Sequence, residues 1–168
     1  MGEQITYKYY EQVDLPPLPE EMIKEMYWSI DNCKNIFYDP KHQWYQSFLV
    51  SKPLADFTKQ LFKFEHLAIV QVIQKGLPIH IDFGRTEAFN YIIETGGLNA
   101  TTAFYKRDDF YFDENNKLRP NKLDYEMSEQ ICIPEKKWHK IKVDIPHNVK
   151  NIETKRISLS VYAYKHKK

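Results

Sequence analysis

The spacing of apolar residues changes near residue 67 and divides the chain into two parts. Before that point, apolar residues recur every three to four positions in residues 20–27, directly after a proline-rich stretch, and again in residues 54–64. This period places the apolar side chains on one face of a helix, so it predicts two amphipathic helices. The segment between them, residues 32–46, is rich in aromatic residues and has no helical period, which favours a loop.

From residue 67 onward, short runs of β-branched and aromatic residues predict strands. Gly-Gly, Asp/Asn-rich or proline-containing turns separate the runs. Many short strands with turn signals between them favour a β-sandwich or barrel, here a jelly roll with the two helices packed on one sheet. The predicted strands are LAIVQVIQ (67–74), PIHIDF (78–83), EAFNYIIE (87–94), ATTAFY (100–105), EQICIP (129–134), HKIKVDI (139–145) and RISLSVYAY (156–164).

Length and composition limit the classes of protein to consider. The 168 residues contain no internal repeat and no low-complexity linker, so we expect one domain, with residues 1–66 as a helical cover and 67–164 as a β core. A net charge of +1 gives no support for nucleic-acid binding through a basic surface. No apolar run approaches the roughly 20 residues that span a bilayer, and the N-terminus lacks the apolar region of a signal peptide, so a cytoplasmic protein without a membrane partner is expected. Cys33 and Cys132 have no CxxC spacing and are expected to be free thiols.

Candidate chemistry begins at His80-Ile81-Asp82, inside the predicted strand 78–83. Side chains alternate faces along a strand, so His80 and Asp82 point to the same side. An imidazole and a carboxylate that converge in this way can bind a divalent metal ion. They make up two thirds of the 2-His-1-carboxylate triad typical of non-haem Fe(II) oxygenases.

The C-terminal part supplies a third candidate ligand and a basic group. His147 lies just beyond the end of the predicted strand 139–145, a position from which ligands are commonly presented. In the last strand, Arg156, Ser158 and Ser160 share one face. A buried arginine needs a counterion, and its planar guanidinium matches a carboxylate with two hydrogen bonds. That counterion could be a protein carboxylate or a bound small acid.

The motifs HxD, a distal histidine and RxS, in this order on predicted strands, resemble the Fe(II)/2-oxoglutarate-dependent dioxygenases. The stretches HIDFGRTEAFNYIIE, NATTAFY, PHNVKN and RISLSV are similar to the aspartyl/asparaginyl β-hydroxylase-like and proline-hydroxylase-like branch. The resemblance covers residues 78–162. Because Asp82 supplies the carboxylate ligand that the aspartyl/asparaginyl hydroxylases lack, the proline-hydroxylase-like end of the branch is favoured.

This resemblance implies a double-stranded β-helix, the cupin-like form of the jelly roll. It implies that His80, Asp82 and His147 bind Fe(II), and that 2-oxoglutarate is the cosubstrate. Arg156 would then hold the distal carboxylate of 2-oxoglutarate, with Ser158 beside it. The implied reaction consumes dioxygen and hydroxylates an amino acid, a peptide side chain or a related small molecule.

Five further residues are candidates for binding roles, with structural alternatives. Asn90 and Tyr105 could contact the cosubstrate, or could serve only the packing and hydrogen bonding of their strands. Arg85 could bind an acidic substrate or brace Asp82, with a surface ion pair to a neighbouring glutamate as the alternative. Trp138 and His139 could line the mouth of the substrate site, with packing of the tryptophan at a strand edge as the alternative.

The longest predicted connection, Lys106–Lys122, contains Asp113, Asn115 and Asn116, which predict a hairpin tip. The spacing of a calcium loop and its closing glutamate are missing. Long ordered loops are often functional, so a flap over a binding site is a further expectation.

Two other functions stay open on the sequence alone. A non-catalytic jelly-roll module would bind a glycan or a protein through its aromatic residues and would bind no metal at His80. A cupin-like metal enzyme would bind a metal ion through the same ligands but would not use 2-oxoglutarate.

Overall fold

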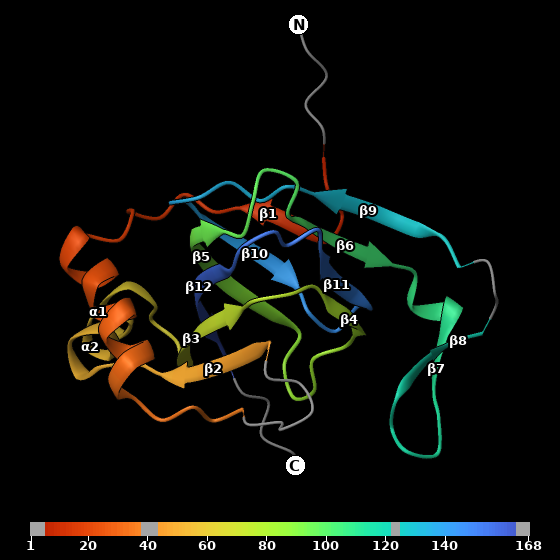
Figure 1. The fold of residues 1–168 in the computed structure, drawn as a ribbon, viewed down its shortest axis with the longest axis horizontal. Coiled ribbons are helices and arrows are strands. Elements are labelled where there is room, and N and C mark those ends of the chain that lie inside the picture. The colour runs from red at the N-terminus through yellow and green to blue at the C-terminus, as the bar shows by residue number, and fades with distance from the viewer. Residues whose placement is uncertain (1–5, 38–43, 122–124, 164–168) are drawn as a thin grey trace, which may run out of the picture.

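The computed structural model describes residues 6–37, 44–121 and 125–163, and within these ranges the protein is mainly β (Figure 1). Two antiparallel sheets face each other, and two helices cover the outer face of the larger sheet. The basic residues at 165–168 lie outside the described ranges. No helix in the described part of the chain has the length and apolar character needed to cross a membrane.

The larger sheet has six strands, and β12 lies near its centre. β12 pairs with β3 and β5, and every one of its seven residues is buried. Ile157, Leu159 and Val161 face the helices, whereas the alternating residues face the smaller sheet. The strand order is β1 (Tyr10–Gln12), β10 (Trp138–Lys142), β5 (Glu87–Thr95), β12 (Arg156–Tyr162), β3 (Leu67–Ile73) and β2 (Tyr45–Leu49).

The smaller sheet has four strands in the order β4 (Leu77–His80), β11 (His147–Lys150), β6 (Thr101–Tyr105) and β9 (Met127–Ile131). The sequence pattern did not predict β11, and His147 is its first residue rather than a residue beyond a strand end. The run HNVK is short and polar, and it alternates only between buried and half-buried positions. It is a strand because β4 and β6 pair with it on both sides.

Helices α1 (Glu20–Asn32) and α2 (Lys52–Leu61) confirm the two predicted helices. Ser51 caps α2, since its Oγ accepts a hydrogen bond from the Leu54 N–H at 3.4 Å. The fully buried side chains of Met26 and Leu54 anchor the two helices to β12 and β3 through one apolar cluster. The N-terminal portion is not purely helical, however, because β1 and β2 join the six-stranded sheet.

A separate hairpin follows β6. It consists of a short 3-10 turn (Arg107–Asp109), β7 (Phe110–Phe112) and β8 (Leu118–Pro120). The Asp113 carboxylate accepts hydrogen bonds from the N–H groups of Asn115 and Lys117 at 2.9 Å, and Asn116 has φ 56°. This confirms the predicted hairpin tip. Lys122 lies outside the described residues.

Candidate metal centre

His80 and His147 lie directly opposite each other on neighbouring antiparallel strands, β4 and β11. Side chains at such paired positions project to the same face of a sheet, and here the two ring centroids are 4.4 Å apart. The Nδ1 of His80 lies 2.7 Å from the Pro78 carbonyl oxygen, and the Nδ1 of His147 lies 2.7 Å from the Ile145 carbonyl oxygen. A carbonyl only accepts, so each Nδ1 carries a proton and each Nε2 is directed at the cluster. The Nε2 of His147 is a free electron-pair donor, whereas the Nε2 of His80 donates to Asp82 when it is protonated.

Asp82 completes the cluster from the turn after β4. The sequence predicted a strand through residue 83, but β4 ends at His80. The backbone of Asp82 is held instead by a hydrogen bond from its N–H to the Val143 carbonyl oxygen at 2.9 Å. Its Oδ1 lies 3.4 Å from the Nε2 of His80 and 3.9 Å from the Nε2 of His147. One ligand atom from each residue lies within 4.8 Å of the others, so the three can hold a metal ion.

The protonation states of Asp82 and His147 suit metal binding. Burial alone would raise the pKa of Asp82, but the His80 hydrogen bond and the Arg85 charge outweigh it and hold this pKa well below its usual range. Burial lowers the pKa of His147 to about 4. An ionised carboxylate and a neutral imidazole are the forms that bind metals. Two imidazoles and one carboxylate fit Fe(II) with open coordination positions.

Arg85 braces Asp82 on the side away from the histidines. Its Nη2 donates to the Asp82 Oδ2 at 2.5 Å, and its guanidinium stacks over the Tyr162 ring with its carbon 3.9 Å from the ring centroid. Asp82 therefore has one oxygen held by arginine and the other directed at the imidazoles. Of the contacts predicted for Arg85, the structure shows the one with Asp82, and it shows no ion pair between Arg85 and Glu87.

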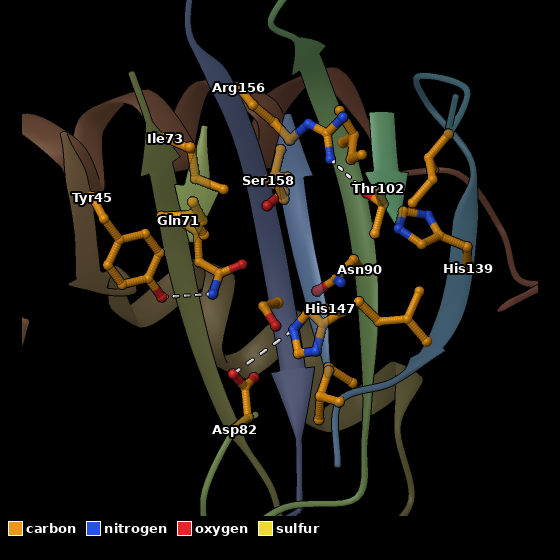
Figure 2. Close-up of a pocket in the computed structure, with 18 of the residues that line it drawn as sticks. Tyr45, Gln71, Ile73, Asp82, Asn90, Thr102, His139, His147, Arg156 and Ser158 are labelled. Atoms are coloured by element: carbon orange, nitrogen blue, oxygen red, sulfur yellow. Dashed lines mark hydrogen bonds and ion pairs between the residues drawn. The ribbon is translucent and has the colours of Figure 1, made fainter. Parts of the chain in front are cut away.

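A cavity between the two sheets extends from these three residues to Arg156 (Figure 2). In this view Arg156 and Asp82 lie at opposite ends, with Ser158 and Asn90 between them. Arg156 is 4% exposed. Its Nε donates to the Thr95 carbonyl and its Nη1 to the Thr102 Oγ1, both at 3.0 Å, while Nη2 has no partner.

No carboxylate of the described residues lies within ion-pair distance of Arg156, although burial lowers its pKa only to about 10 and leaves it charged at neutral pH. A buried charge without a counterion is costly. A carboxylate that enters the cavity can supply the missing partner, with geometry suited to the guanidinium. Asn90 lines the same cavity, and its buried Oδ1 has no hydrogen-bond partner either.

Two predicted site residues are not brought to the cavity. Tyr105 points to the other face of β6, where its hydroxyl donates to the Asn148 Oδ1 at 3.2 Å and its ring packs against Phe110. Trp138 is 1% exposed in the core under the helices, and its Nε1–H donates to the Pro16 carbonyl at 3.0 Å. The packing alternative for Trp138 is therefore the observed one, because its neighbour His139 takes the cavity side of β10.

Two polar residues of the cavity wall, Gln71 and Thr102, were not among the candidates from the sequence. Gln71 donates from Nε2 to the Tyr45 hydroxyl at 2.9 Å, which fixes both side chains on the wall. Alternation along the strand 100–105 separates Thr102 from Tyr105, so a correct assignment of the inward face would have found Thr102.

A second, wider cleft of about 490 Å³ opens on the outer side of His80 and Asp82. Its wall is mainly aromatic, and Phe83 at its edge is 69% exposed. The Phe83 ring contacts Phe112 of the β7–β8 hairpin, with centroids 5.4 Å apart. The aromatic residues that line the cleft are Phe37, Trp44, Tyr45, Phe83 and Tyr162.

No protein-family model matches the chain, and no curated protein matches it by sequence. Among solved structures, a prolyl hydroxylase from Trichoplax adhaerens, in complex with a hypoxia-inducible factor peptide, matches with a TM-score of 0.53 and 10% identity. The match covers 93% of this chain and 83% of that one. At this identity the likeness concerns the fold, and the chain therefore has the fold of this hydroxylase.

Two other matches have lower TM-scores. A 2OG-Fe(II) oxygenase family protein from Burkholderia pseudomallei matches at 0.41 and 11% identity, over 69% of this chain and 53% of that one. Bacillus subtilis oxalate decarboxylase matches at 0.43 and 11% identity, over 83% of this chain and 30% of that one. The match thus spans less than a third of the length of the decarboxylase.

Proposed function

We propose that this protein is an Fe(II)- and 2-oxoglutarate-dependent oxygenase that hydroxylates an amino acid, a peptide side chain or a related small molecule. One observation carries the proposal. A single cavity has a His80, Asp82 and His147 cluster at one end and a buried arginine without a carboxylate partner at the other. A ligand that chelates a metal at one end and carries a carboxylate at the other matches both ends.

In this proposal His80, Asp82 and His147 hold Fe(II). Asp82 is already ionised and His147 already neutral, whereas His80, whose pKa is raised by Asp82 against the effect of burial, loses a proton as the metal binds. Iron with 2-oxoglutarate couples the reduction of dioxygen to the hydroxylation of a C–H bond, with release of succinate and carbon dioxide. Arg156 binds the distal carboxylate. Ser158 and Asn90 line the wall between the two ends, where they orient the cosubstrate and exclude water.

The substrate reaches the metal centre through the outer aromatic cleft, because this cleft shares His80, Asp82 and Arg85 with the inner cavity. The peptide in the prolyl hydroxylase complex supports peptides as one substrate class. A contact between an acidic substrate and Arg85 stays a prediction. It is supported by the buried Nη1 atom of Arg85, which has no hydrogen-bond partner in the structure. The β7–β8 hairpin as a lid also stays a prediction, supported by the Phe83–Phe112 contact.

The decisive experiment is anaerobic titration of the Fe(II)-loaded protein with 2-oxoglutarate. We expect a weak metal-to-ligand absorption band in the visible region. His80→Ala should abolish iron binding and therefore the band. A protein that binds metal but gives no band and no succinate would instead be a cupin-like metal enzyme that does not use 2-oxoglutarate. A protein that binds no metal would favour the binding module.

Arg156→Ala tests the other end of the cavity. Loss of a buried charge-assisted contact should weaken 2-oxoglutarate binding by at least about tenfold, while the metal affinity is unchanged. Arg119→Ala is the matched control, because Arg119 is an exposed arginine that contacts only the Asp113 carboxylate of the hairpin. Equal 2-oxoglutarate affinity in the Arg156 and Arg119 variants would refute the assignment.

A further inference from the structure

His139 is a buried histidine whose ring nitrogens make no well-formed hydrogen bond within the fold. Its side chain leaves β10 on the cavity side, opposite Asn90 in the strand register, and the residue is 1% exposed. Neither ring nitrogen makes a well-formed hydrogen bond, although the backbone of Lys137, two residues earlier, is close enough to interact with the ring. The Tyr10 ring packs against it from the edge of the sheet, with ring centroids 5.7 Å apart.

The other described histidines show that this situation is unusual within the molecule. His66, His80 and His147 each place a ring nitrogen at hydrogen-bond distance from a backbone carbonyl. A buried polar group without a partner costs free energy relative to water, and such groups occur where a ligand completes them. His139 shares its cavity with two other such groups, the Arg156 Nη2 and the Asn90 Oδ1.

The charge of this end of the cavity favours a neutral imidazole. Burial lowers the pKa of His139 to about 3; the Lys137 backbone acts in the opposite direction, and the nearby Arg156 charge adds a smaller lowering. With His139 neutral, Arg156 carries the positive charge at this end of the cavity, and the negative charge of one carboxylate is enough to balance it. A neutral His139 adds one N–H donor without adding a second positive charge, and Figure 2 shows its ring beside Thr102, which holds Arg156.

We propose that His139 binds the distal carboxylate of the cosubstrate as a neutral N–H donor, together with Arg156 and Thr102. The inference rests on the proposed function and adds a residue to its carboxylate site. The three groups come from β10, β12 and β6, so they surround the carboxylate from both sheets. Their shared role is to select a 2-oxo dicarboxylic acid over a 2-oxo monocarboxylic acid.

The test compares two ligands in the metal-loaded protein under anaerobic conditions. One is 2-oxoglutarate, and the other is 2-oxopentanoate, which has the same five-carbon chain without the distal carboxylate. In His139→Leu we expect 2-oxoglutarate binding to weaken by at least about tenfold, with little change for 2-oxopentanoate. His139→Gln, which keeps an N–H donor, should recover most of the affinity.

Stability separates this role from a structural one. Leucine removes two unpaired nitrogens from a buried position, so the ligand-free His139→Leu protein should melt no lower than the wild type, with unchanged metal affinity. The proposal would be overturned if His139→Leu weakened the binding of both ligands equally, or if it left the 2-oxoglutarate affinity unchanged. It would also be overturned if His139→Leu lowered the melting temperature and His139→Gln did not restore the 2-oxoglutarate affinity.

A measurement on the wild-type protein does not depend on how the variants fold. In the Zn(II)-loaded protein, 2-oxoglutarate should give a slowly exchanging imidazole N–H signal that 2-oxopentanoate does not give and that His139→Gln lacks. An unchanged imidazole spectrum at saturating 2-oxoglutarate would overturn the role of His139 alone. Failure of the wild type to bind either ligand would overturn the proposed function, and this inference with it.

Discussion

At the scale of single residues, the two arginines of the site differ in what they contact. Arg85 forms an ion pair with Asp82 and stacks on Tyr162. Arg156 contacts only neutral groups, a carbonyl and a hydroxyl. The first arginine therefore orients a proposed metal ligand, while the second has no carboxylate of the described residues as its partner. Substitutions at the two positions should separate metal binding from cosubstrate binding.

Arg85→Gln should weaken metal binding about 10- to 100-fold, the usual effect of removing a group that orients a metal ligand. Without the guanidinium, Asp82 is free to rotate away from the imidazoles, and its negative charge is less stabilised. Isothermal titration with Mn(II) measures the change. The control is Arg119→Gln, which removes an arginine–aspartate pair of similar length far from the cluster. Equal affinities in the two variants would contradict the bracing role.

The neutral His139 should also make stability depend on pH. Its pKa is about 3 in the folded protein, against an ordinary value of 6.5, so between these values the unfolded chain binds a proton that the folded chain does not. The free energy of unfolding should therefore rise with pH in this window, by up to about 1.4 kcal/mol per pH unit.

Urea unfolding of the metal-free protein at pH 4.5 to 6.5 measures this slope. His139→Gln should reduce it by the contribution of one proton. His147, with a pKa lowered to about 4, contributes in the same direction and stays in the variant, so the slope does not fall to zero. An identical slope in both proteins would show that His139 is protonated in the fold.

The sequence predicted the cluster from the types and order of its residues, although Asp82 lies in the turn after β4 and not on the strand. It predicted Arg156 from alternation along one strand. Arg156 and Ser158 alternate on one strand, and that strand is buried throughout. It named Trp138 and His139 together as candidates for the mouth of the substrate site, but it could not tell which of the two faces the cavity, because they are adjacent and only one of them can do so. Which one does so depends on how β10 pairs with β5, and that pairing joins residues far apart in the chain.

At the scale of elements, the two helices are joined by one buried hydroxyl. The Ser29 Oγ donates to the Glu25 carbonyl at 2.7 Å and accepts from the Ser51 N–H at 2.9 Å. Ser51 in turn caps α2. The helices were predictable because each has an apolar period of its own. The strands β1, β2 and β11 were not, since each is short and gains its conformation from a neighbouring strand.

Ser29→Ala should destabilise the protein by about 1–3 kcal/mol, because it leaves the buried Ser51 N–H without an acceptor. Urea unfolding measures the loss. Asn32→Ala is the control, since the Asn32 side chain bonds the Trp28 carbonyl from an exposed position near the end of the same helix. The helices lie outside the sheets, so 2-oxoglutarate binding should be retained in both variants. A Ser29 effect no larger than that of Asn32 would contradict the proposed junction.

At the scale of the whole molecule, the two ends of the cavity belong to different sheets. His80 and His147 lie on the four-stranded sheet, and Arg156 lies on the six-stranded sheet. A ligand that spans the cavity therefore connects the sheets.

We expect metal and 2-oxoglutarate together to stabilise the fold more than metal alone. At a 2-oxoglutarate concentration of 100 times its dissociation constant, the added stabilisation should be about 2.7 kcal/mol. Thermal unfolding with Mn(II), with and without 2-oxoglutarate, measures it, and a chelator should abolish it. A cosubstrate effect that persists in Arg156→Ala would argue against binding across the two sheets.

The alternation along β12 also has a consequence for insertions and deletions. Its two sets of side chains face different surroundings, with Ile157, Leu159 and Val161 in the helix-side core and Arg156 in the cavity. Removal of one residue from this strand would exchange the two sets. Arginine would enter an apolar core while branched aliphatic groups filled the ligand cavity. Such a one-residue register shift would damage folding and ligand binding together. We therefore expect β12 to tolerate substitutions far better than insertions or deletions.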